Sequence, residues 1–268
     1  MKILITGAAG NLGTRMRHLL QHVYQIRASD LRAPDRPTPG EEFIAAELAD
    51  LAQVERAVEG VEGILHLGGL PVEHPWEEIL QSNIVGNYNL FEAARRHGVK
   101  RVVFASSNQA IGFYRRERRL GADVTVRPSS RYGLSKAFGE AVGALYADKH
   151  ALRVLCIRIG RVHDYPEDVR RLALWLHPED LAQLVRIGLE HPALHYEIVY
   201  GISDNERSWY DNERARALGY RPTWRAEDFA AKAVELQRGI TPNPVADRFM
   251  GARHTAMEYD GDLDRSGT

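Results

Sequence analysis

The sequence is poor in cysteine, in net charge and in long hydrophobic runs, and each of these absences excludes a class of function. Cys156 is the only cysteine among 268 residues, so the chain can form neither an internal disulfide nor a cysteine-based metal cluster. Thirty-five basic residues stand against thirty-six acidic ones without long blocks of one sign, which argues against nucleic acid or anionic membrane as a partner. The apolar run after Met1 is too short for a signal-peptide core, and no run approaches a membrane span. We therefore expect a soluble protein of the reducing cytoplasm.

Short apolar runs alternate with longer segments of helical periodicity. This alternation is typical of βαβ units, and right-handed crossovers then predict an α/β fold with a doubly wound parallel sheet. The predicted strands are residues 3–5, 25–29, 43–46, 63–67, 101–106 and 154–159. After Gly160 the pattern loosens, with a predicted helix near 178–190 and a strand at 198–200. We expect residues 1–160 to form the sheet core and residues 161–268 a small substrate-covering lobe integrated with it.

A glycine-rich turn, Thr6-Gly7-Ala8-Ala9-Gly10-Asn11-Leu12-Gly13, directly follows the first predicted strand. Gly7 allows a tight turn, Gly10 lets backbone N–H groups approach a pyrophosphate, and Gly13 permits close helix–strand packing. The phosphates would then lie at the positive end of the following helix. Glycine-rich turns also close ordinary βα units, so the motif alone is a weak indication of a dinucleotide site.

An acidic residue, Asp30, ends the second predicted strand, where a carboxylate can accept hydrogen bonds from the adenosine ribose hydroxyls. Because a carboxylate there repels a 2′-phosphate, the sequence favours NAD over NADP. Arg32 leaves a second interpretation open, since a nearby guanidinium can hold that phosphate, although an arginine after a strand is commonly just solvated. Residues 1–160 are therefore predicted to be an NAD-binding Rossmann core.

Tyr132 and Lys136 are four residues apart at the start of a predicted helix and so share one of its faces. A nearby ammonium is expected to lower the pKa of the tyrosine from about 10, which would make Tyr132 a general base near neutral pH. The pair follows a strand that ends in Ser106-Ser107, whose hydroxyls can orient a substrate oxygen. This tyrosine–lysine spacing also occurs by chance on amphipathic helices, but the three elements together are much more specific.

These motifs resemble those of the extended short-chain dehydrogenase/reductase family. Together with His66-Leu67-Gly68-Gly69 they occur along the chain in the same order as in that family. Within that family the chain is similar to the uronate dehydrogenases and related NAD-dependent sugar 1-dehydrogenases. The segments behind this closer resemblance are Gly68-Gly69, Ile79–Asn83, Phe104–Asn108, Arg158–Gly160, Arg170 with Trp175, and Val199–Gly201. The resemblance therefore extends into the C-terminal lobe.

The resemblance implies that NAD oxidises the C1 hydroxyl of a pyranose to give a lactone. Tyr132 would remove the hydroxyl proton, Lys136 would hold the tyrosine and the nicotinamide ribose, and Ser107 would orient the substrate oxygen. Asn108 would bind sugar hydroxyls, and the guanidinium of Arg170 would hold the carboxylate of the anionic sugar. The implied cofactor contacts are Gly7, Ala9, Gly10, Asn11, Leu12, Gly13, Asp30, Leu48, Leu67, Gly68, Gly69, Asn83, Ser106, Tyr132 and Lys136. The implied substrate contacts are Pro71, Ser107, Asn108, Gln109, Tyr132, Arg161 and Arg170.

Three residues depart from the uronate dehydrogenase pattern around the expected substrate pocket. Pro71 replaces a serine, Gln109 a histidine, and Arg161 a small hydroxyl residue. A second arginine with Gln109 could suit a group with three acceptor oxygens, so glucose 6-phosphate and sulfoquinovose stay open as alternatives to a uronate. Arg161 could instead pair with Asp164 or Glu167 as part of the structure.

Two further functions stay open at the level of the sequence. A nucleotide-sugar epimerase or dehydratase would use the same tyrosine with tightly held NAD, although such relatives usually have a longer lobe than this chain offers after Gly160. A non-catalytic NAD sensor would have no need of Tyr132 and Lys136. With one cysteine the chain has no Cys-x-x-Cys pattern, and we expect no metal site. By the resemblance, the helical segment 76–97 is a subunit-packing face, so we expect a homo-oligomer.

Overall fold

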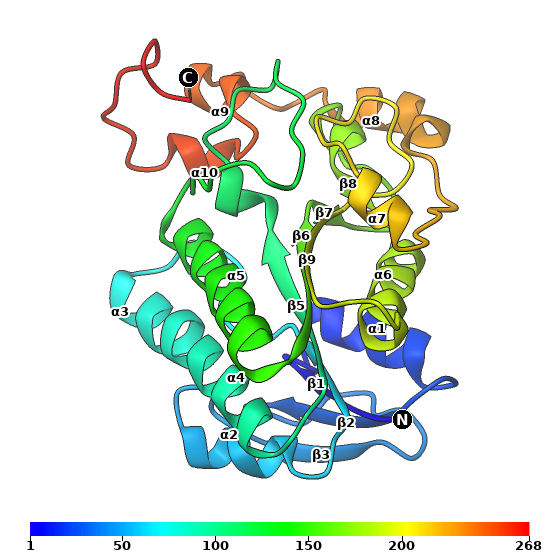
Figure 1. The fold of residues 1–268 in the computed structure, drawn as a ribbon. Coiled ribbons are helices and arrows are strands. Elements are labelled where there is room, and N and C mark those ends of the chain that lie inside the picture. The colour runs from blue at the N-terminus through cyan, green and yellow to red at the C-terminus, as the bar shows by residue number, and fades with distance from the viewer. Residues whose placement is uncertain (268) are drawn as a thin grey trace. The chain divides into compact units, whose positions relative to one another are not determined.

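Helices and strands alternate along the chain in the computed structural model, which describes residues 1–267 (Figure 1). The strands are β1 (Lys2–Thr6), β2 (Gln25–Asp30), β3 (Glu42–Ala45), β4 (Gly63–His66), β5 (Arg101–Ser107), β6 (Arg153–Ile159), β7 (Arg161–Val162), β8 (Trp175–Leu176) and β9 (Tyr196–Gly201). The helices are α1 (Asn11–Leu20), α2 (Leu51–Val58), α3 (Trp76–Ile79), α4 (Gly86–Arg96), α5 (Arg131–His150), α6 (Pro178–Glu190), α7 (Glu213–Ala217), α8 (Ala230–Leu236), α9 (Pro244–Arg248) and α10 (Arg253–Ala256). The predicted strands and the predicted helix at 178–190 are confirmed, with small shifts at the strand ends.

Seven of these strands form one sheet in the order β3-β2-β1-β4-β5-β6-β9. β1 pairs in parallel with β2 and β4, and the pairs β2–β3 and β4–β5 are parallel as well. In this register Ile5 lies between Ala28 and Leu65, and it is completely buried because helices cover both faces of such a sheet. The order is that of the expected doubly wound fold with one more strand. The order in which strands are added to the sheet reverses between β1 and β4, and folds of this type place their ligands at that point.

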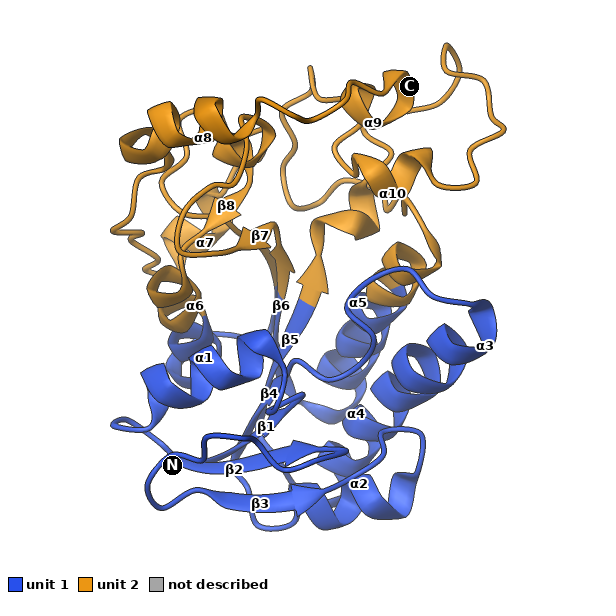
Figure 2. Ribbon diagram, turned by 180° about the vertical axis from the view of Figure 1, so that it is seen from behind, with its two compact units in different colours: residues 1–105, 138–156, 185–197 blue, residues 106–137, 157–184, 198–268 orange. Residues whose placement is uncertain are grey.

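The residues group into two compact units that interleave along the chain (Figure 2). Unit 1 comprises residues 1–105, 138–156 and 185–197, and unit 2 comprises residues 106–137, 157–184 and those from 198 onward. The chain passes from unit 1 into unit 2 near the carboxyl ends of β5 and β6. The division into residues 1–160 and 161–268 stays a prediction about where the cofactor-binding part ends.

Within unit 1, α4 and α5 are joined by a buried carboxylate. Glu92 on α4 accepts a hydrogen bond of 2.9 Å from the hydroxyl of Tyr146 on α5, and its two oxygens also accept from Arg95. The guanidinium of Arg95 holds the pKa of Glu92 far below its usual range. Glycine lets α5 approach β5, since a Cβ on Gly139 would lie 2.3 Å from the ring of Phe104.

Unit 2 has hydrophobic clusters of its own. One cluster contains Tyr114, Leu174, Tyr200, Tyr210 and Met250 among others. Another gathers around the fully buried Trp175, with Leu172, Ala226 and Ala233. The guanidinium of Arg115 donates to the backbone carbonyls of Leu263, Asp264 and Ser266, which anchors the polar C-terminal segment in this unit.

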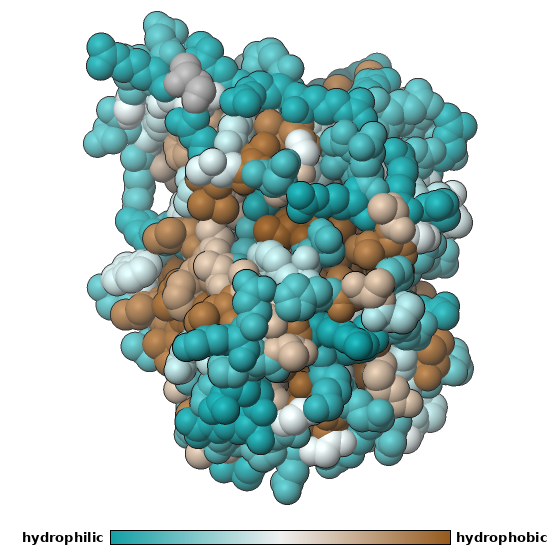
Figure 3. Space-filling model, in the orientation of Figure 1, coloured by the Kyte–Doolittle hydropathy of each residue, from teal (hydrophilic) through white to brown (hydrophobic). Residues whose placement is uncertain are grey.

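Exposed apolar side chains of unit 1 gather on α3, α4 and α5. Trp76, Tyr88 and Leu145 are 40%, 48% and 51% exposed. In Figure 3 brown side chains lie among paler ones in the part of the surface where Figure 1 shows α4 and α5. A gathering of this kind marks a candidate contact surface, whereas single exposed apolar residues are ordinary. No helix within residues 1–267 is long and apolar enough to cross a membrane.

Candidate active site

The glycine-rich turn between β1 and α1 has a backbone that only glycine allows. Gly7 adopts φ +65°, and a Cβ on it would lie 2.9 Å from the backbone of Leu67 and Gly68. A Cβ on Gly13 would lie 2.1 Å from the carbonyl oxygen of Gly7. The turn is therefore tight, and it leads directly into the N-terminus of α1, at Asn11, where unpaired N–H groups favour an anion.

A cavity of about 430 Å³ opens at this turn, in unit 1, at the carboxyl ends of β1, β2 and β4. Most of the predicted cofactor contacts line it, namely Gly7, Ala9, Gly10, Asn11, Leu12, Gly13, Asp30, Leu48, Leu67, Gly68 and Gly69. Pro71, predicted to contact substrate, lies on the same wall. Backbone N–H donors beside one carboxylate suit the pyrophosphate and ribose of NAD.

Asp30 both shapes the glycine-rich turn and faces the cavity. Its Oδ2 atom accepts a hydrogen bond of 2.9 Å from the N–H of Ala9, and its Oδ1 atom accepts one of 2.8 Å from the N–H of Leu31. A carboxylate oxygen has a second lone pair, so Asp30 can still accept from ribose hydroxyls. Arg32 also lines the cavity.

Asn83, another predicted cofactor contact, does not line this cavity in the structure. Its side-chain oxygen accepts from the N–H of Leu70 at 2.8 Å, and its amide nitrogen donates to the carbonyl of the same residue at 3.1 Å. Gly69, with φ +115°, passes so close that a Cβ there would lie 2.8 Å from Asn83 Oδ1. Asn83 therefore fixes the loop after β4, on which Gly68 and Gly69 face the cavity.

Ser107, Tyr132 and Lys136 come together in unit 2. Ser107 ends β5, and its hydroxyl is hydrogen bonded to the phenol of Tyr132 and accepts from the N–H of Gln109 at 3.1 Å. Tyr132 lies in the first turn of α5, and the Nζ atom of Lys136 lies 5.6 Å from the centre of its ring. Ser106, predicted to contact the cofactor, precedes Ser107 on the same strand and is buried. The structure thus assembles the triad that spacing could only suggest.

Burial controls the proton affinities of this triad. It raises the pKa of Tyr132 to about 12, and the hydrogen bond with Ser107 offsets only part of this. It also lowers the pKa of Lys136 to about 8. The sequence leads one to expect a lowered pKa for Tyr132, whereas in the structure it is raised, because burial removes the phenolate from water and the hydrogen bond with Ser107 offsets only part of that cost.

Asn108 and Gln109 follow Ser107 in a short 3-10 helix and are buried. The side-chain oxygen of Gln109 accepts a hydrogen bond from Ser129, and its backbone packs so closely on Gly133 that a Cβ there would lie 2.4 Å from the Gln109 carbonyl. In this arrangement Gln109 joins β5 to the start of α5. Asn108 lies beside the buried phenol of Tyr210.

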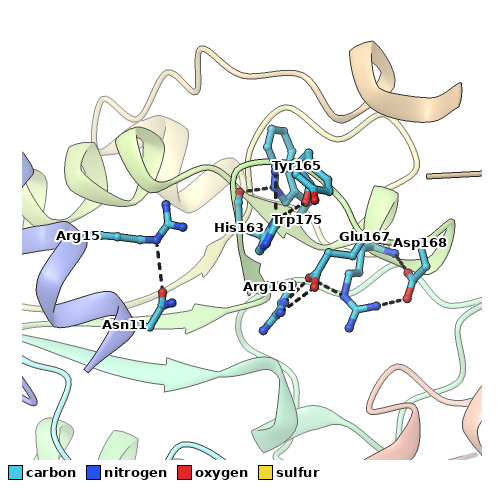
Figure 4. Close-up of polar contacts among 9 residues, drawn as sticks. Asn11, Arg15, Arg161, His163, Tyr165, Glu167, Asp168 and Trp175 are labelled. Carbon is cyan, nitrogen blue, oxygen red and sulfur yellow. Dashed lines mark hydrogen bonds and ion pairs between the residues drawn. The ribbon is translucent and has the colours of Figure 1, made fainter. Parts of the chain in front are cut away.

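Arg161 is engaged with a carboxylate from its own unit (Figure 4). Its Nε and Nη2 atoms donate to the two oxygens of Glu167 at 2.6 and 2.9 Å, so the guanidinium fork is occupied. Arg171 also pairs with Glu167 and with Asp168. Of the two alternatives for Arg161, the structure shows the ion pair with Glu167. In unit 1, Figure 4 also shows Arg15 donating to Asn11 at the start of α1.

Arg170 differs from Arg161 because no carboxylate within residues 1–267 forms an ion pair with it. Its guanidinium donates to the backbone carbonyl of Met250 and lies 5.9 Å from the ring of Trp209. Its buried Nε atom has no hydrogen-bond partner among the described residues. Burial and the neighbouring Arg116 lower the pKa of Arg170 to about 10. An anion beside Arg170 would relieve both effects.

One neighbour of the triad comes from a part of the chain that the sequence did not single out. The ring of His254, on α10, lies 6.2 Å from the ring of Tyr132. Gly251, three residues earlier, packs against Gln109 and Ser129. No local pattern predicts this contact, because more than a hundred residues separate its partners. Tyr210, Phe249 and Met250 are buried in unit 2, and Trp209 lines a cavity of the same unit.

Comparison with known proteins gives a consistent result. Residues 3–166 match the NAD dependent epimerase/dehydratase family. The chain is 47% identical over 249 residues to uronate dehydrogenase of Pseudomonas putida, covering 92% of this chain and 91% of that protein. It is 38% identical to the NAD-dependent glucose-6-phosphate dehydrogenase of Haloferax volcanii, covering 87% of this chain and 97% of that protein. The structure of a tyrosine-to-alanine mutant of uronate dehydrogenase from Agrobacterium tumefaciens, in complex with NAD, matches with a TM-score of 0.91 and 41% identity, over 95% of this chain and 97% of that chain.

Proposed function

The chain belongs to the NAD-dependent epimerase/dehydratase family, and from this membership we propose that it is an NAD-dependent sugar 1-dehydrogenase that oxidises a hexuronate to its aldonolactone. The observation that carries the proposal is Arg170. Its guanidinium is largely buried in the unit that holds Ser107, Tyr132 and Lys136, and no carboxylate of residues 1–267 pairs with it. A buried cation without a counterion is costly, so a substrate carboxylate at this position would bind favourably.

The triad accounts for the proton transfer. Ser107 holds the C1 oxygen of the sugar by a hydrogen bond, and Tyr132 takes the proton of the C1 hydroxyl. To accept this proton Tyr132 must first be a phenolate, a form that burial disfavours. A charged Lys136, next to the ring, stabilises that phenolate, and the proton transfer then neutralises it. NAD supplies the hydride acceptor when it is bound. Arg170 holds the C6 carboxylate, so that C1 on the other side of the ring is presented to Tyr132.

NAD rather than NADP follows from Asp30. Its carboxylate is fixed in the cavity by the N–H groups of Ala9 and Leu31, and it would lie against a 2′-phosphate. Bringing two negative groups together in this way is unfavourable, whereas ribose hydroxyls donate to the same oxygens.

A carboxylate is a better candidate than a sulfonate or phosphate as the anionic group of the substrate. The alternative with three acceptor oxygens requires a second arginine, and Arg161 already makes two hydrogen bonds to Glu167. A carboxylate requires only one guanidinium, which Arg170 provides.

The assembly and location are part of the same proposal. We propose a homo-oligomer in which the exposed apolar residues of α3, α4 and α5, among them Trp76, Tyr88 and Leu145, form the subunit contact. The lone cysteine, Cys156, is buried and forms no disulfide, in keeping with the reducing cytoplasm.

The test is an assay of NADH formation with NAD and, in turn, galacturonate, glucuronate, glucose 6-phosphate and sulfoquinovose. We expect turnover with a uronate at a kcat/KM well above that with the other two sugars. Retention of NAD through purification, without net NADH formation from any of these sugars, would instead indicate an epimerase or dehydratase.

A further inference from the structure

Unit 2 contains a cavity of about 830 Å³ that Arg170 shares with residues outside the triad. Its wall has an excess of positive charge. The lining includes five arginines, at positions 116, 170, 171, 207 and 253, and two aspartates, at positions 168 and 247. This volume is in the upper part of the range of about 300–1,000 Å³ for pockets that hold drug-sized ligands. A single hexuronate is a smaller molecule, so it would leave much of the cavity to water.

Three of these five arginines have no carboxylate partner within residues 1–267. Arg171 pairs with Asp168, and Arg207 pairs with Glu227. Arg116 donates to the backbone carbonyls of residues 246 and 249, and Arg170 to that of residue 250. Arg253 forms no ion pair among the described residues, and its side chain is exposed at the cavity wall. If Arg170 holds one substrate carboxylate, Arg116 and Arg253 are left to hold another.

One short segment forms a wall common to this cavity and to the triad. On one side, Gly251 packs on Gln109, and the ring of His254 lies against Tyr132. On the other side, Ala252 and Arg253 line the cavity. Ala252 has φ +51°, an unusual value for a residue with a side chain, and such strained backbone is often found at ligand sites. The cavity therefore adjoins the position proposed for the sugar.

Pyranose geometry then gives the direction in which a longer substrate would extend. C4 lies opposite C1 in the six-membered ring and next to C5, which carries the carboxyl carbon. With C1 at Tyr132 and the carboxylate at Arg170, a substituent on O4 would extend away from the first sugar on the side that faces Arg170. The cavity with its unpaired arginines is on that side.

Resting on the proposed function, we propose that this cavity receives a second uronate residue, so that the substrates include short 4-linked uronides with a free reducing end. The reaction is the same at the reducing-end residue. The C1 hydride passes to NAD, the hydroxyl proton passes to Tyr132, and the glycosidic bond stays intact. The carboxylate of the second residue pairs with Arg253 and Arg116, and Trp209, which lies 5.4 Å from the guanidinium of Arg116, offers it an apolar surface.

The experiment compares galacturonate with its α-1,4-linked dimer as substrates. NADH formation gives kcat/KM, and mass spectrometry identifies the product of the dimer as the dimer less two hydrogens, so that traces of the monomer do not count. The variants are Arg253→Gln and, as a matched control, Arg265→Gln, whose side chain is 90% exposed in an ion pair with Asp262 and does not line the cavity. Arg116→Gln gives a second, independent test of the cavity wall.

We expect the wild-type protein to oxidise the dimer. Arg253→Gln should lower kcat/KM for the dimer by about 10- to 100-fold, the effect of losing one charged hydrogen bond, while that for galacturonate changes by less than about threefold. Arg265→Gln should change neither. Oxidation of galacturonate without oxidation of the dimer, or an equal loss for both substrates in Arg253→Gln, would overturn the inference and leave the proposed function standing. Absence of turnover with both substrates and with glucuronate would instead refute the proposed function.

Discussion

Replacing Lys136 by methionine should make the protein more stable at neutral pH while it removes most of the activity. Lys136 is only 6% exposed, and burial lowers its pKa from 10.5 to about 8. A difference of this size corresponds to a penalty of up to about 3 kcal/mol for keeping the charged amine in the folded protein. Methionine has a similar length and no charge, so the Lys136→Met protein avoids that penalty. For a chain of this size the gain corresponds to a rise in Tm of roughly 5–10 °C.

The pH dependence distinguishes this cause from better packing. Between pH 8 and 10.5 the unfolded chain binds more protons at Lys136 than the folded protein does, so this group adds stability as the pH rises through that window. The advantage of Lys136→Met should therefore be largest near pH 7 and shrink towards pH 10. Denaturant unfolding of both proteins at several pH values measures this difference in stability. Tyr132→Phe is the control, because the raised pKa of the Tyr132 phenol lies above the window. A Lys136→Met protein that is less stable than wild type at pH 7, or a difference that does not change with pH, would refute the reasoning.

Three further predictions concern individual side chains. Tyr132→Phe should lower turnover by several orders of magnitude and leave NAD binding, measured by calorimetry, within about twofold, since Tyr132 is proposed to accept the substrate proton; unchanged turnover would contradict that role. Asp30→Asn keeps an acceptor for the N–H of Ala9 but removes the negative charge. The ratio of kcat/KM with NADP to kcat/KM with NAD should therefore rise at least about tenfold. A constant ratio would exclude Asp30 as the group that discriminates between the two cofactors. Arg161→Ala should leave KM for a uronate within about threefold, because its guanidinium binds Glu167, and a KM raised a hundredfold would show that it leaves Glu167 to bind substrate.

Local patterns were sufficient to select residues that the structure brings to one cavity wall. The glycine spacing from Gly7 to Gly13 and the position of Asp30 at a strand end depend on neighbouring residues, and the structure places them on one cavity wall. Tyr132 and Lys136 were found for the same reason, since helical spacing brings them together. The place of Asn83 could not be predicted in this way, because its contacts with Leu70 depend on a loop conformation that the sequence pattern does not determine.

The parts that sequence could not provide depend on long-range packing or on burial. The approach of His254 to Tyr132 joins residues that are distant in the chain. The direction of the Tyr132 pKa shift depends on how far burial removes the phenolate from water, and only the structure gives that burial. The sequence left Arg161 open between substrate and Glu167, and the geometry shows it with Glu167.

The most direct test of the central claim is the specificity of the wild-type and Arg170→Met proteins for a charged over an uncharged sugar. NADH formation is measured with glucuronate and with glucose, which differ in the C6 group that Arg170 is proposed to hold. We predict that wild type prefers glucuronate and that Arg170→Met lowers kcat/KM for glucuronate by about 100-fold or more while that for glucose stays within a few-fold. A wild-type protein that produces no NADH from a uronate, or an Arg170→Met protein that keeps the preference for glucuronate, would contradict the account.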